Sequence, residues 1–438
     1  MDVISKPQPI DLSPFETETP GGEPKYGLPS DIAFCSRCII SNQRPNSAVE
    51  FKHTKDSKKA TINFDTDRIC DACRVAEQKV NIDWDERERE LCDLLDKHRR
   101  TDGRYDCIVP GSGGKDSFYA AHVLKYKYGM HPLTITWAPH VYTDWGWRNF
   151  QRWIHAGFDN QLFTPNGRVH RLLTRLAIDN ILHPFQPFIL GQKNLAPKMS
   201  VLHDVSLVFF GENEAEYGNP KGQVSQARRD ASYFTSMDKK EISLGGVSYE
   251  DLTGQFGMED VDLDPYLPAN PEDIERVGTD VHYLGYYLKW HPQSCYYYAQ
   301  EHAGFEPSPE RTVGTYSKYN SIDDRIDDFH YYTTFIKFGI GRATYDAAQE
   351  IRSDDITRDE GIALVRKFDG EYPERFAVEI FEYLSLPENE YPEASKMFES
   401  PTIDHEYFDT LCDSFRSPHI WKHENGVWSL RDAVWHND

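Results

Sequence analysis

The residues best suited to binding phosphate lie in one short loop between an apolar run and a helical pattern. They are Gly111, Ser112, Gly113, Gly114, Lys115, Asp116 and Ser117. Glycines let backbone N–H groups approach a phosphate, and a helix N-terminus adds partial positive charge. Val109 and Asp116 stand where a Walker P-loop needs glycine and serine or threonine, so the loop is of another type. We predict an anion site, with a ligand-free glycine turn as the alternative.

A second group of reactive residues is acidic and follows the apolar run 205–210. It contains Gly211, Glu212 and Glu214. Carboxylates at the end of a strand, beside a phosphate loop, are well placed to hold Mg²⁺. We therefore predict that Asp116 and Glu214 contact Mg²⁺, and that Glu212 contacts either the metal or the substrate. A solvated acidic loop is the alternative.

Two Cys-x-x-Cys pairs have the spacing of a metal site. They are formed by Cys35, Cys38, Cys70 and Cys73. Two such turns can close a tetrahedron of thiolates around a structural Zn²⁺, and metal binding would then supply folding energy that a small module lacks. Short strands expected at 49–51 and 60–64 make the module similar to a zinc ribbon. Iron, a redox pair or four separate thiols are the alternatives.

Composition limits the classes of partner. The 438 residues carry a net charge of −23, which argues against nucleic acid because phosphate backbones need a basic surface. The chain shows no apolar run of about 18 residues, so we expect no membrane span. The N-terminus lacks a basic-then-apolar signal pattern, which makes the cytoplasm the expected compartment.

Apolar runs alternate with helical patterns from residue 105 onward. The expected strands are 107–109, 133–137, 161–163, 205–210 and 281–290. The expected helices include 84–100, 144–157, 169–182 and 185–203. Such alternation predicts an α/β fold with a doubly wound parallel sheet, whose ligand binds at the carboxyl ends of the strands.

The order of these patterns predicts five segments. They are a flexible leader at 1–30, a zinc-binding four-cysteine module at 31–80, a linker helix at 81–104, a catalytic domain at 105–320 and a helical region at 321–438. An insertion at 216–275 interrupts the catalytic domain. A long excursion beside the strand ends is typical of a lid, a substrate wall or a partner contact.

The loop SGGKDS resembles the SGGxDS loop of the ATP pyrophosphatases, or PP-loop enzymes. That superfamily cleaves ATP between its α and β phosphates and adenylates an oxygen of the substrate. The resemblance implies a PP-loop type of sheet with ATP bound along residues 111–117. GENEAEYG is similar to the Gly-Glu-Gly-Ala-Asp-Glu element of asparagine synthetase, but Asn213 replaces a glycine and Glu214 precedes the alanine.

Four further site residues follow from this resemblance by position. Thr136 and Trp137 end the second strand, which helps to form the adenosine pocket in PP-loop enzymes; ordinary core packing is the alternative. Lys337 and Arg342 are candidates for the late cations that stabilise charge growing on pyrophosphate. The alternative for these two is a surface or structural cation.

Several motifs in one order narrow the resemblance. The cysteine-rich leader, IVPGSGGKDS, FFGENEAEYG and KFGIGRATYDAAQEIRSDDITRDEGIALVRKFDGEYP together resemble the N-acetyl sugar amidotransferase family of surface-polysaccharide biosynthesis. The resemblance spans roughly residues 31–400. It implies an ATP-dependent conversion of a sugar's acetamido group into an acetamidino group. The sugar would be a nucleotide-linked uronic acid or a nonulosonic acid precursor, used for lipopolysaccharide, capsule or flagellin glycans.

The ammonia source is expected to be a separate protein. A glutaminase with an N-terminal nucleophile needs cysteine after the initiator, where this chain has Asp2, and no Gly-x-Cys-x-Gly elbow occurs. The family resemblance implies a partner similar to the glutaminase and cyclase subunits of imidazole glycerol phosphate synthase. Two rival functions remain open: a tRNA-thiolating PP-loop enzyme, which needs a basic face and a reactive cysteine, and a non-catalytic nucleotide-binding scaffold.

Overall fold

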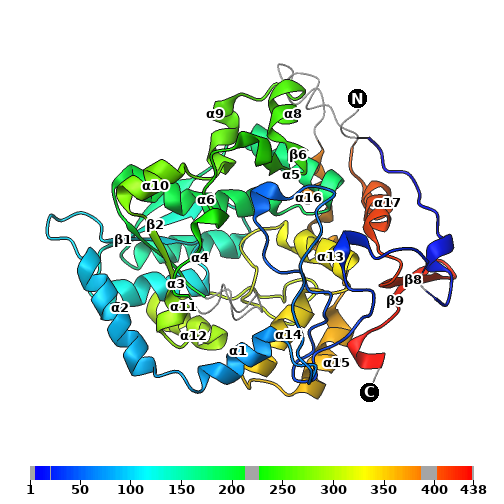
Figure 1. The fold of residues 1–438 in the computed structure, drawn as a ribbon, viewed down its shortest axis with the longest axis horizontal. Helices are drawn as coiled ribbons and strands as arrows, with labels where there is room; N and C mark the ends of the chain where they lie inside the picture. The colour runs from blue at the N-terminus through cyan, green and yellow to red at the C-terminus, as the bar shows by residue number, and fades with distance from the viewer. Residues whose placement is uncertain (1–4, 20, 213–225, 386–401, 437–438) are drawn as a thin grey trace.

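The computed structural model describes residues 5–19, 21–212, 226–385 and 402–436 (Figure 1). At its centre lies a parallel five-stranded sheet in the order β3-β2-β1-β4-β7. The strands are β1 Cys107–Pro110, β2 Pro132–Trp137, β3 Asp159–Phe163, β4 Leu207–Phe210 and β7 Asp280–Tyr283. The predicted α/β fold with a parallel sheet is therefore confirmed.

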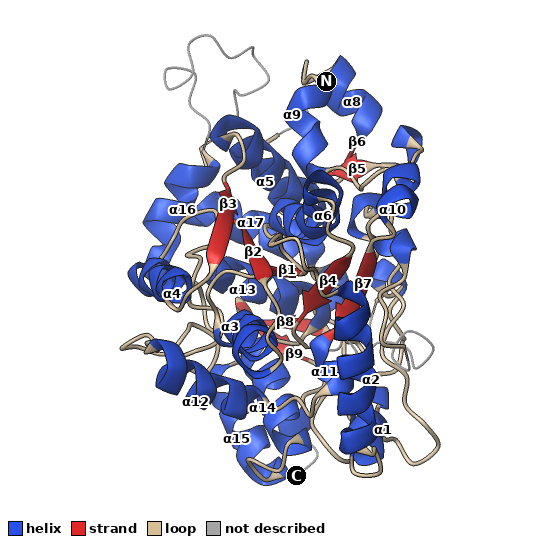
Figure 2. Cartoon of the chain, turned by 90° about the vertical axis from the view of Figure 1, so that its left-hand side faces the viewer, coloured by secondary structure: helices blue, strands red, loops and turns tan. Residues whose placement is uncertain are grey.

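The sheet separates two hydrophobic cores, because successive side chains of a strand point to opposite faces. Ile108 packs with helices α5 Gly167–Ile181 and α6 Gln186–His203. Cys107 and Val109 of the same strand pack on the other side. That face is covered by α2 Trp84–His98, α3 Lys115–His122, α4 Asp144–His155 and α12 Pro292–Ala303. Figure 2 shows helices on both sides of the sheet.

The strand order creates a crevice between β1 and β4. The chain leaves β1 toward β2 on one side and leaves β4 toward β7 on the other. In open α/β sheets, ligands bind at the carboxyl ends of the strands where the order reverses in this way. The glycine loop follows β1, and Gly211 and Glu212 follow β4. The fold thus brings the predicted phosphate loop and acidic loop to the same crevice.

Three predicted strands differ from the structure. The fifth strand ends at Tyr283, because the chain turns into helix α11 Leu284–Tyr287. Residues 49–51 and 60–64 do not form the strands of a zinc ribbon. Glu50–Lys52 is a 3-10 turn, and the second segment makes only the isolated bridges of Thr61 and Phe64. The four cysteines of the module converge without an extended ladder, and α1 Asp71–Lys79 begins within the second pair.

The described part of the insertion is a small subdomain packed on α5 and α6. It comprises the hairpin β5 Ser243–Leu244 and β6 Val247–Ser248 with α8 Tyr249–Gly254, α9 Asp260–Leu263 and α10 Pro271–Val277. Its side chains Leu244, Leu252 and Tyr266 join the core beneath the sheet. The predicted roles of this insertion as a lid, substrate wall or partner contact stay predictions.

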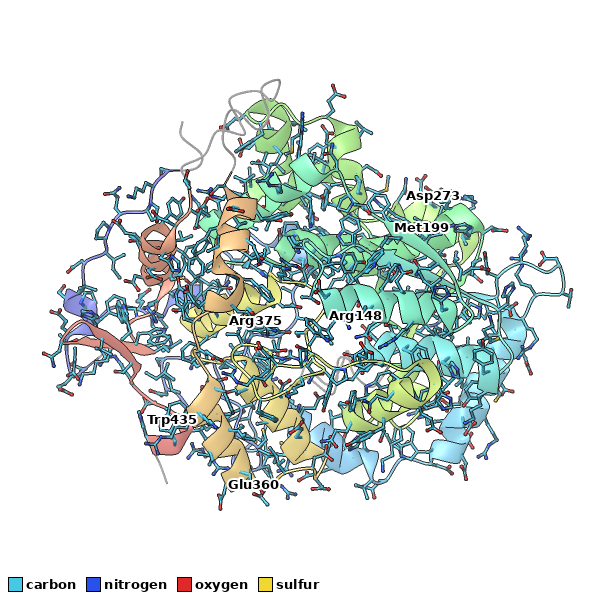
Figure 3. The ribbon with its side chains drawn as sticks, turned by 180° about the vertical axis from the view of Figure 1, so that it is seen from behind. Arg148, Met199, Asp273, Glu360, Arg375 and Trp435 are labelled. Atoms are coloured by element: carbon cyan, nitrogen blue, oxygen red, sulfur yellow. The ribbon has the colours of Figure 1, made fainter. Side chains whose placement is uncertain are left out.

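The C-terminal region is mostly helical, as predicted, but it also contains an unexpected hairpin. Its helices are α13 Asp327–Phe338, α14 Arg342–Arg352, α15 Arg358–Phe368, α16 Ala377–Leu384 and α17 His405–Phe415, and its strands are β8 Trp421–Glu424 and β9 Val427–Leu430. Figure 3 shows this region from behind, with Glu360 of α15 and Trp435 near one edge. Within the described ranges, every helix is too short or too polar to traverse a bilayer.

Candidate functional site

A cavity of about 600 Å³ opens at the crevice. Three distant stretches supply walls: residues 112–116, part of the segment 40–62, and α13 with α14. Eight predicted site residues line it, namely Ser112, Gly113, Gly114, Lys115, Asp116, Glu212, Lys337 and Arg342. The structure therefore joins the glycine loop and the two late cations, which lie far apart in the sequence, in one cavity.

At Gly113 the glycine loop has a backbone conformation that other residues would not tolerate. Gly113 has a φ of +88°, and a Cβ at this position would lie 2.8 Å from Phe150 Cα of α4. Helix α3 starts directly after Gly114, so its free N–H groups face the loop. A tight loop of small residues ahead of a helix N-terminus fits a phosphate group.

Lys115 and its neighbours form the first charged group of the cavity, the Lys115 group, made of Lys115, Asp116 and Glu212. Lys115 Nζ lies 2.6 Å from Asp116 Oδ2. Burial works against its charge, but Asp116 and Glu212 outweigh burial and raise the pKa of Lys115. Asp116 Oδ1 is buried without a hydrogen-bond partner. A free carboxylate oxygen beside a phosphate loop fits Mg²⁺. Glu214, the other predicted ligand, lies outside the described residues.

Two acidic residues, Asp323 just before α13 and Asp327 at its first position, line the cavity but are not predicted by the sequence. The Ser112 hydroxyl donates to Asp323, and burial raises the pKa of Asp323 and of Asp327. Arg342 faces them from α14, with Nη1 donating to Tyr331 Oη at 2.7 Å. The sequence showed only an acidic helix start here, and nothing in the spacing linked it to the glycine loop.

Lys337 lines the same cavity among different neighbours. Its side chain is buried on the last turn of α13, and Nζ donates to the Ile181 carbonyl at 2.9 Å. Among the described residues, no carboxylate forms an ion pair with it. Burial, and after it repulsion from Lys59, lowers the pKa of Lys337 to about 7, and Glu50 opposes this only in part.

The residues around Lys337 form the second charged group, the Lys337 group. It consists of Glu50, His53, Lys59, His183, His330 and Lys337, all of which line the cavity. Glu50 Oε2 lies 3.5 Å from His53 Nδ1 and 3.9 Å from His183 Nε2. These three side chains have the spacing of a metal site. However, Lys59 Nζ lies 3.4 Å from His53 Nδ1, and the charge of Lys59 also acts on Glu50. We therefore assign no metal here.

The Lys337 group could not be found from the sequence. Its histidines come from separate segments without a ligand spacing, and Glu50 lies in a stretch that was predicted to be a strand. Burial lowers the pKa of His53, His183 and His330, so these imidazoles are neutral at pH 7. Only tertiary folding brings them to one place.

Two predicted adenosine contacts lie in the core instead of at the cavity. Thr136 is fully buried and accepts from Asn160 Nδ2 at 3.0 Å. Trp137 is 3% exposed and stacks on Phe163. Neither lines the cavity, and none of the described cysteines does so. Cys295 of α12 lies close enough to Asp116, Lys115 and Glu212 for their charges to act on its thiol. Burial raises the pKa of that thiol, which disfavours the reactive thiolate that a tRNA-thiolating enzyme would need.

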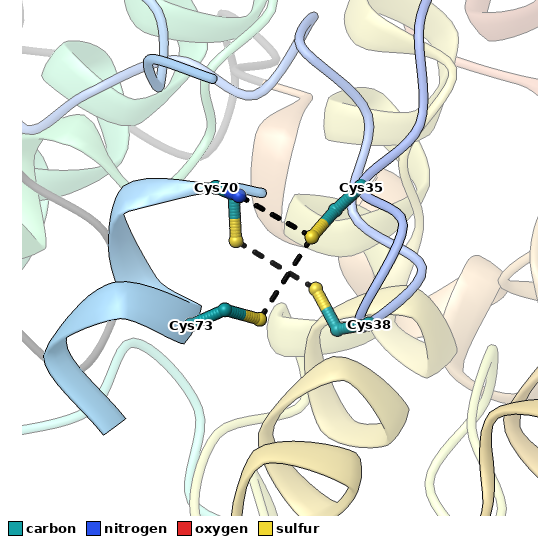
Figure 4. Close-up of side chains that lie close together, drawn as sticks. All are labelled: Cys35, Cys38, Cys70 and Cys73. Carbon is teal, nitrogen blue, oxygen red and sulfur yellow. Dashed lines mark hydrogen bonds between the residues drawn. The ribbon is translucent and has the colours of Figure 1, made fainter. Parts of the chain in front are cut away.

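The four cysteines of the two Cys-x-x-Cys pairs converge (Figure 4). Cys35 Sγ lies 3.8 Å from Cys73 Sγ, and Cys38 Sγ lies 3.7 Å from Cys70 Sγ. Zn–S bonds of about 2.3 Å around a tetrahedral ion give S···S edges of about 3.8 Å. The donor set and its spacing thus fit a structural Zn²⁺.

This four-cysteine cluster is attached to a wall of the cavity. Its cysteines pack with Ala343 and Ala347 of α14 and with Ile362 of α15. Arg358 Nε donates to the Cys38 carbonyl at 3.2 Å. Because α14 also carries Arg342, the four-cysteine cluster packs against the helix that supplies a cation to the cavity.

Comparisons with known proteins match parts of the chain. Residues 313–434 match a family model described as "LPS biosynthesis protein WbpG-like, C-terminal domain". Over 83 residues, the chain is 34% identical to the uncharacterized protein MJ1599 of Methanocaldococcus jannaschii. That alignment covers 19% of this chain and 29% of the relative. The chain therefore spans under a third of the length of this relative.

The family match includes one wall of the cavity. Asp323, Asp327, Lys337 and Arg342 all lie within residues 313–434. The C-terminal part of the chain is therefore similar to the C-terminal domain of lipopolysaccharide biosynthesis proteins, and that part faces the glycine loop.

Proposed function

We propose that the protein is an AMP-forming, ATP-dependent amidotransferase of surface-polysaccharide biosynthesis. It converts the acetamido group of an N-acetyl sugar into an acetamidino group. The observation that carries this proposal is the meeting of the SGGKDS loop and the lipopolysaccharide-type C-terminal region in one cavity. The SGGKDS loop supports ATP as the activating substrate, and the family match supports a sugar acceptor.

The first half-reaction activates the amide, because an amide carbonyl is a poor electrophile. The amide oxygen attacks the α phosphorus of ATP and pyrophosphate leaves. The glycine loop and the N-terminus of α3 orient the phosphates, while Lys115 and Arg342 offset the negative charge that grows on the leaving group. Asp116 and the predicted ligand Glu214 would hold Mg²⁺, which would offset negative charge on the phosphates when bound.

The second half-reaction replaces oxygen by nitrogen. Ammonia attacks the imidate carbon, and AMP leaves with the former amide oxygen. No protein nucleophile is required, and the enzyme needs to position the reactants and stabilise charge. We propose that a separate glutaminase supplies the ammonia, so that free ammonium, but not glutamine, supports turnover by the isolated chain.

One assay tests this proposal. The protein is incubated with ATP, Mg²⁺ and ammonium, together with nucleotide-linked and nonulosonic N-acetyl sugars. Pyrophosphate, AMP and a sugar in which NH replaces oxygen are expected. ADP and phosphate as products would exclude AMP-forming chemistry. Tight RNA binding without sugar turnover would favour the tRNA-modifying alternative, and ATP binding without pyrophosphate release would favour a scaffold.

A further inference from the structure

Lys337 lies in an environment that suits proton transfer. Its ammonium group is buried, its hydrogen bond goes to the neutral Ile181 carbonyl, and no described carboxylate pairs with it. A neutral amine can keep this bond, because it still carries N–H groups. Loss of the proton therefore breaks no ion pair, whereas loss of a proton from Lys115 would leave Asp116 unpaired.

The charges that face Lys337 come from three parts of the fold. Lys59, Glu50 and His53 belong to the N-terminal module, His183 follows α5, and His330 lies about two turns before Lys337 on α13. Burial has the largest effect and lowers the pKa of Lys337. Because the three histidines are neutral, the neighbouring charges that add to this effect are Lys59, which disfavours a charge on Lys337, and Glu50, which favours it.

We propose that Lys337 is the general base of the second half-reaction, where it accepts the proton that the attacking nitrogen releases. This inference rests on the proposed function and assigns a group to a step that the function leaves open. It also changes the role predicted for Lys337, from a fixed cation beside pyrophosphate to a group that is neutral before attack and charged after it.

The step balances in atoms and electrons. Ammonia uses its lone pair to form a C–N bond with the imidate carbon, while the π bond between that carbon and the sugar nitrogen breaks and its electron pair moves to the sugar nitrogen. The product is a tetrahedral adduct in which the incoming nitrogen is positively charged. An N–H bond of that nitrogen breaks, and the proton moves to the lone pair of Lys337 Nζ. The electron pair left on nitrogen forms the C=N bond, the C–O bond breaks, and AMP leaves. Lys337 later returns its proton to solvent.

The variants Lys337→Arg and Lys337→Met distinguish two possible roles of Lys337, a proton acceptor and a fixed positive charge. Arginine keeps the charge but stays protonated. We expect both variants to keep sugar-dependent pyrophosphate release and to lose amidine formation by about 10²-fold or more. Rescue of amidine formation by arginine, or loss of pyrophosphate release in both folded variants, would overturn the inference. Lys97→Arg, at an exposed position on α2, is the matched control.

Substitution of two neighbours, Glu50 and Lys59, provides a second test, because the two changes should shift the pH profile of amidine formation in opposite directions. Glu50→Gln removes a charge that favours protonation of Lys337, so the acid limb of amidine formation should move to lower pH. Lys59→Met removes a repelling charge, so the limb should move to higher pH. Shifts of the acid limb in the same direction for both variants, or no shift in either, would contradict the assignment of Lys337 as the base. If wild-type protein releases no pyrophosphate with any N-acetyl sugar, the proposed function fails instead.

Discussion

Lys115 and Lys337 face one cavity and are buried to nearly the same extent, with 7% and 5% exposed. Burial disfavours both charges, yet the pKa of Lys115 is raised and that of Lys337 is lowered to about 7. The difference lies in their partners: Asp116 pairs with Lys115 at 2.6 Å, while Lys337 has a carbonyl oxygen and a second lysine nearby. Burial alone therefore does not set the charge of a lysine.

The same comparison suggests a division of labour. The Lys115 group combines a fixed positive charge with free carboxylate oxygen, which suits binding and cleavage of a magnesium–ATP complex. The Lys337 group combines neutral imidazoles with a lysine that titrates near neutral pH, which suits proton movement. The four predictions below test this contrast.

Asp116→Asn should have the largest effect, because it removes both the partner of Lys115 and a predicted Mg²⁺ ligand. We expect sugar-dependent pyrophosphate release to fall by about 10³-fold. Asp273→Asn, at a half-exposed position on α10, is the control and should behave as wild type. Full activity of Asp116→Asn would mean that the Asp116 carboxylate does not cause the functional difference between Lys115 and Lys337.

Removal of the metal from the four-cysteine cluster should disturb the Lys337 group before the Lys115 group. Glu50 and Lys59 lie between the two cysteine pairs, so their segment loses its anchor when the metal leaves. Chelation or Cys70→Ser should lower the melting temperature and increase hydrogen exchange at 44–62 more than at 111–122. Cys92→Ser, which changes an exposed cysteine outside the cluster, should change neither quantity.

Gly113→Ala tests whether the loop at the Lys115 group needs its backbone. The positive φ costs about 1–2 kcal/mol for a residue with a Cβ, and the close approach to Phe150 adds to this. Gly103→Ala is a matched control, since Gly103 has a φ of +80° and no atom within 4 Å of the added carbon. Denaturant unfolding should show the larger loss for Gly113→Ala, and pyrophosphate release should fall only in that variant.

The two half-reactions should depend differently on pH. This is the smallest of the expected effects, but it tests the charge states of the two lysines directly. Lys115 stays charged because its pKa is raised, so it adds no limb to pyrophosphate release near neutral pH. Lys337 becomes neutral as pH rises through about 7, so amidine formation should rise with pH there. We expect a gain of about fivefold between about pH 6 and pH 7, because the neutral fraction of a group with a pKa of about 7 rises by that factor. If pyrophosphate release and amidine formation had the same pH profile, the proposed difference in function between Lys115 and Lys337 would be wrong.

Local sequence signals predicted much of the fold and part of the site. The glycine loop could be placed because its residues are adjacent, and the parallel strands because their apolar runs are continuous. Family resemblance predicts Lys337 and Arg342 as site residues, and the structure brings both to the cavity. Glu50 and Lys59 were missed because their function depends on neighbours that are distant in the sequence, and such pairing leaves no periodic pattern.

The four-cysteine module showed the limit of pattern matching in another way. The spacing of the cysteines predicted their convergence, but the short apolar segments between them were assigned to strands that do not form. In a module this small, a cluster of four cysteines and the contact with α14 determine the path of the chain more strongly than strand propensity does.

The walls of the cavity, which come from both ends of the chain, also have a consequence for biosynthesis. A nascent chain emerges N-terminus first. The four-cysteine module can bind its metal early, but α14 and α15, on which it packs, are made roughly 270 residues later. The wall made by α13 and α14 can therefore form only after residue 352 has been translated. We expect an unfinished chain to be unable to consume ATP, which would protect the cell from futile hydrolysis on the ribosome.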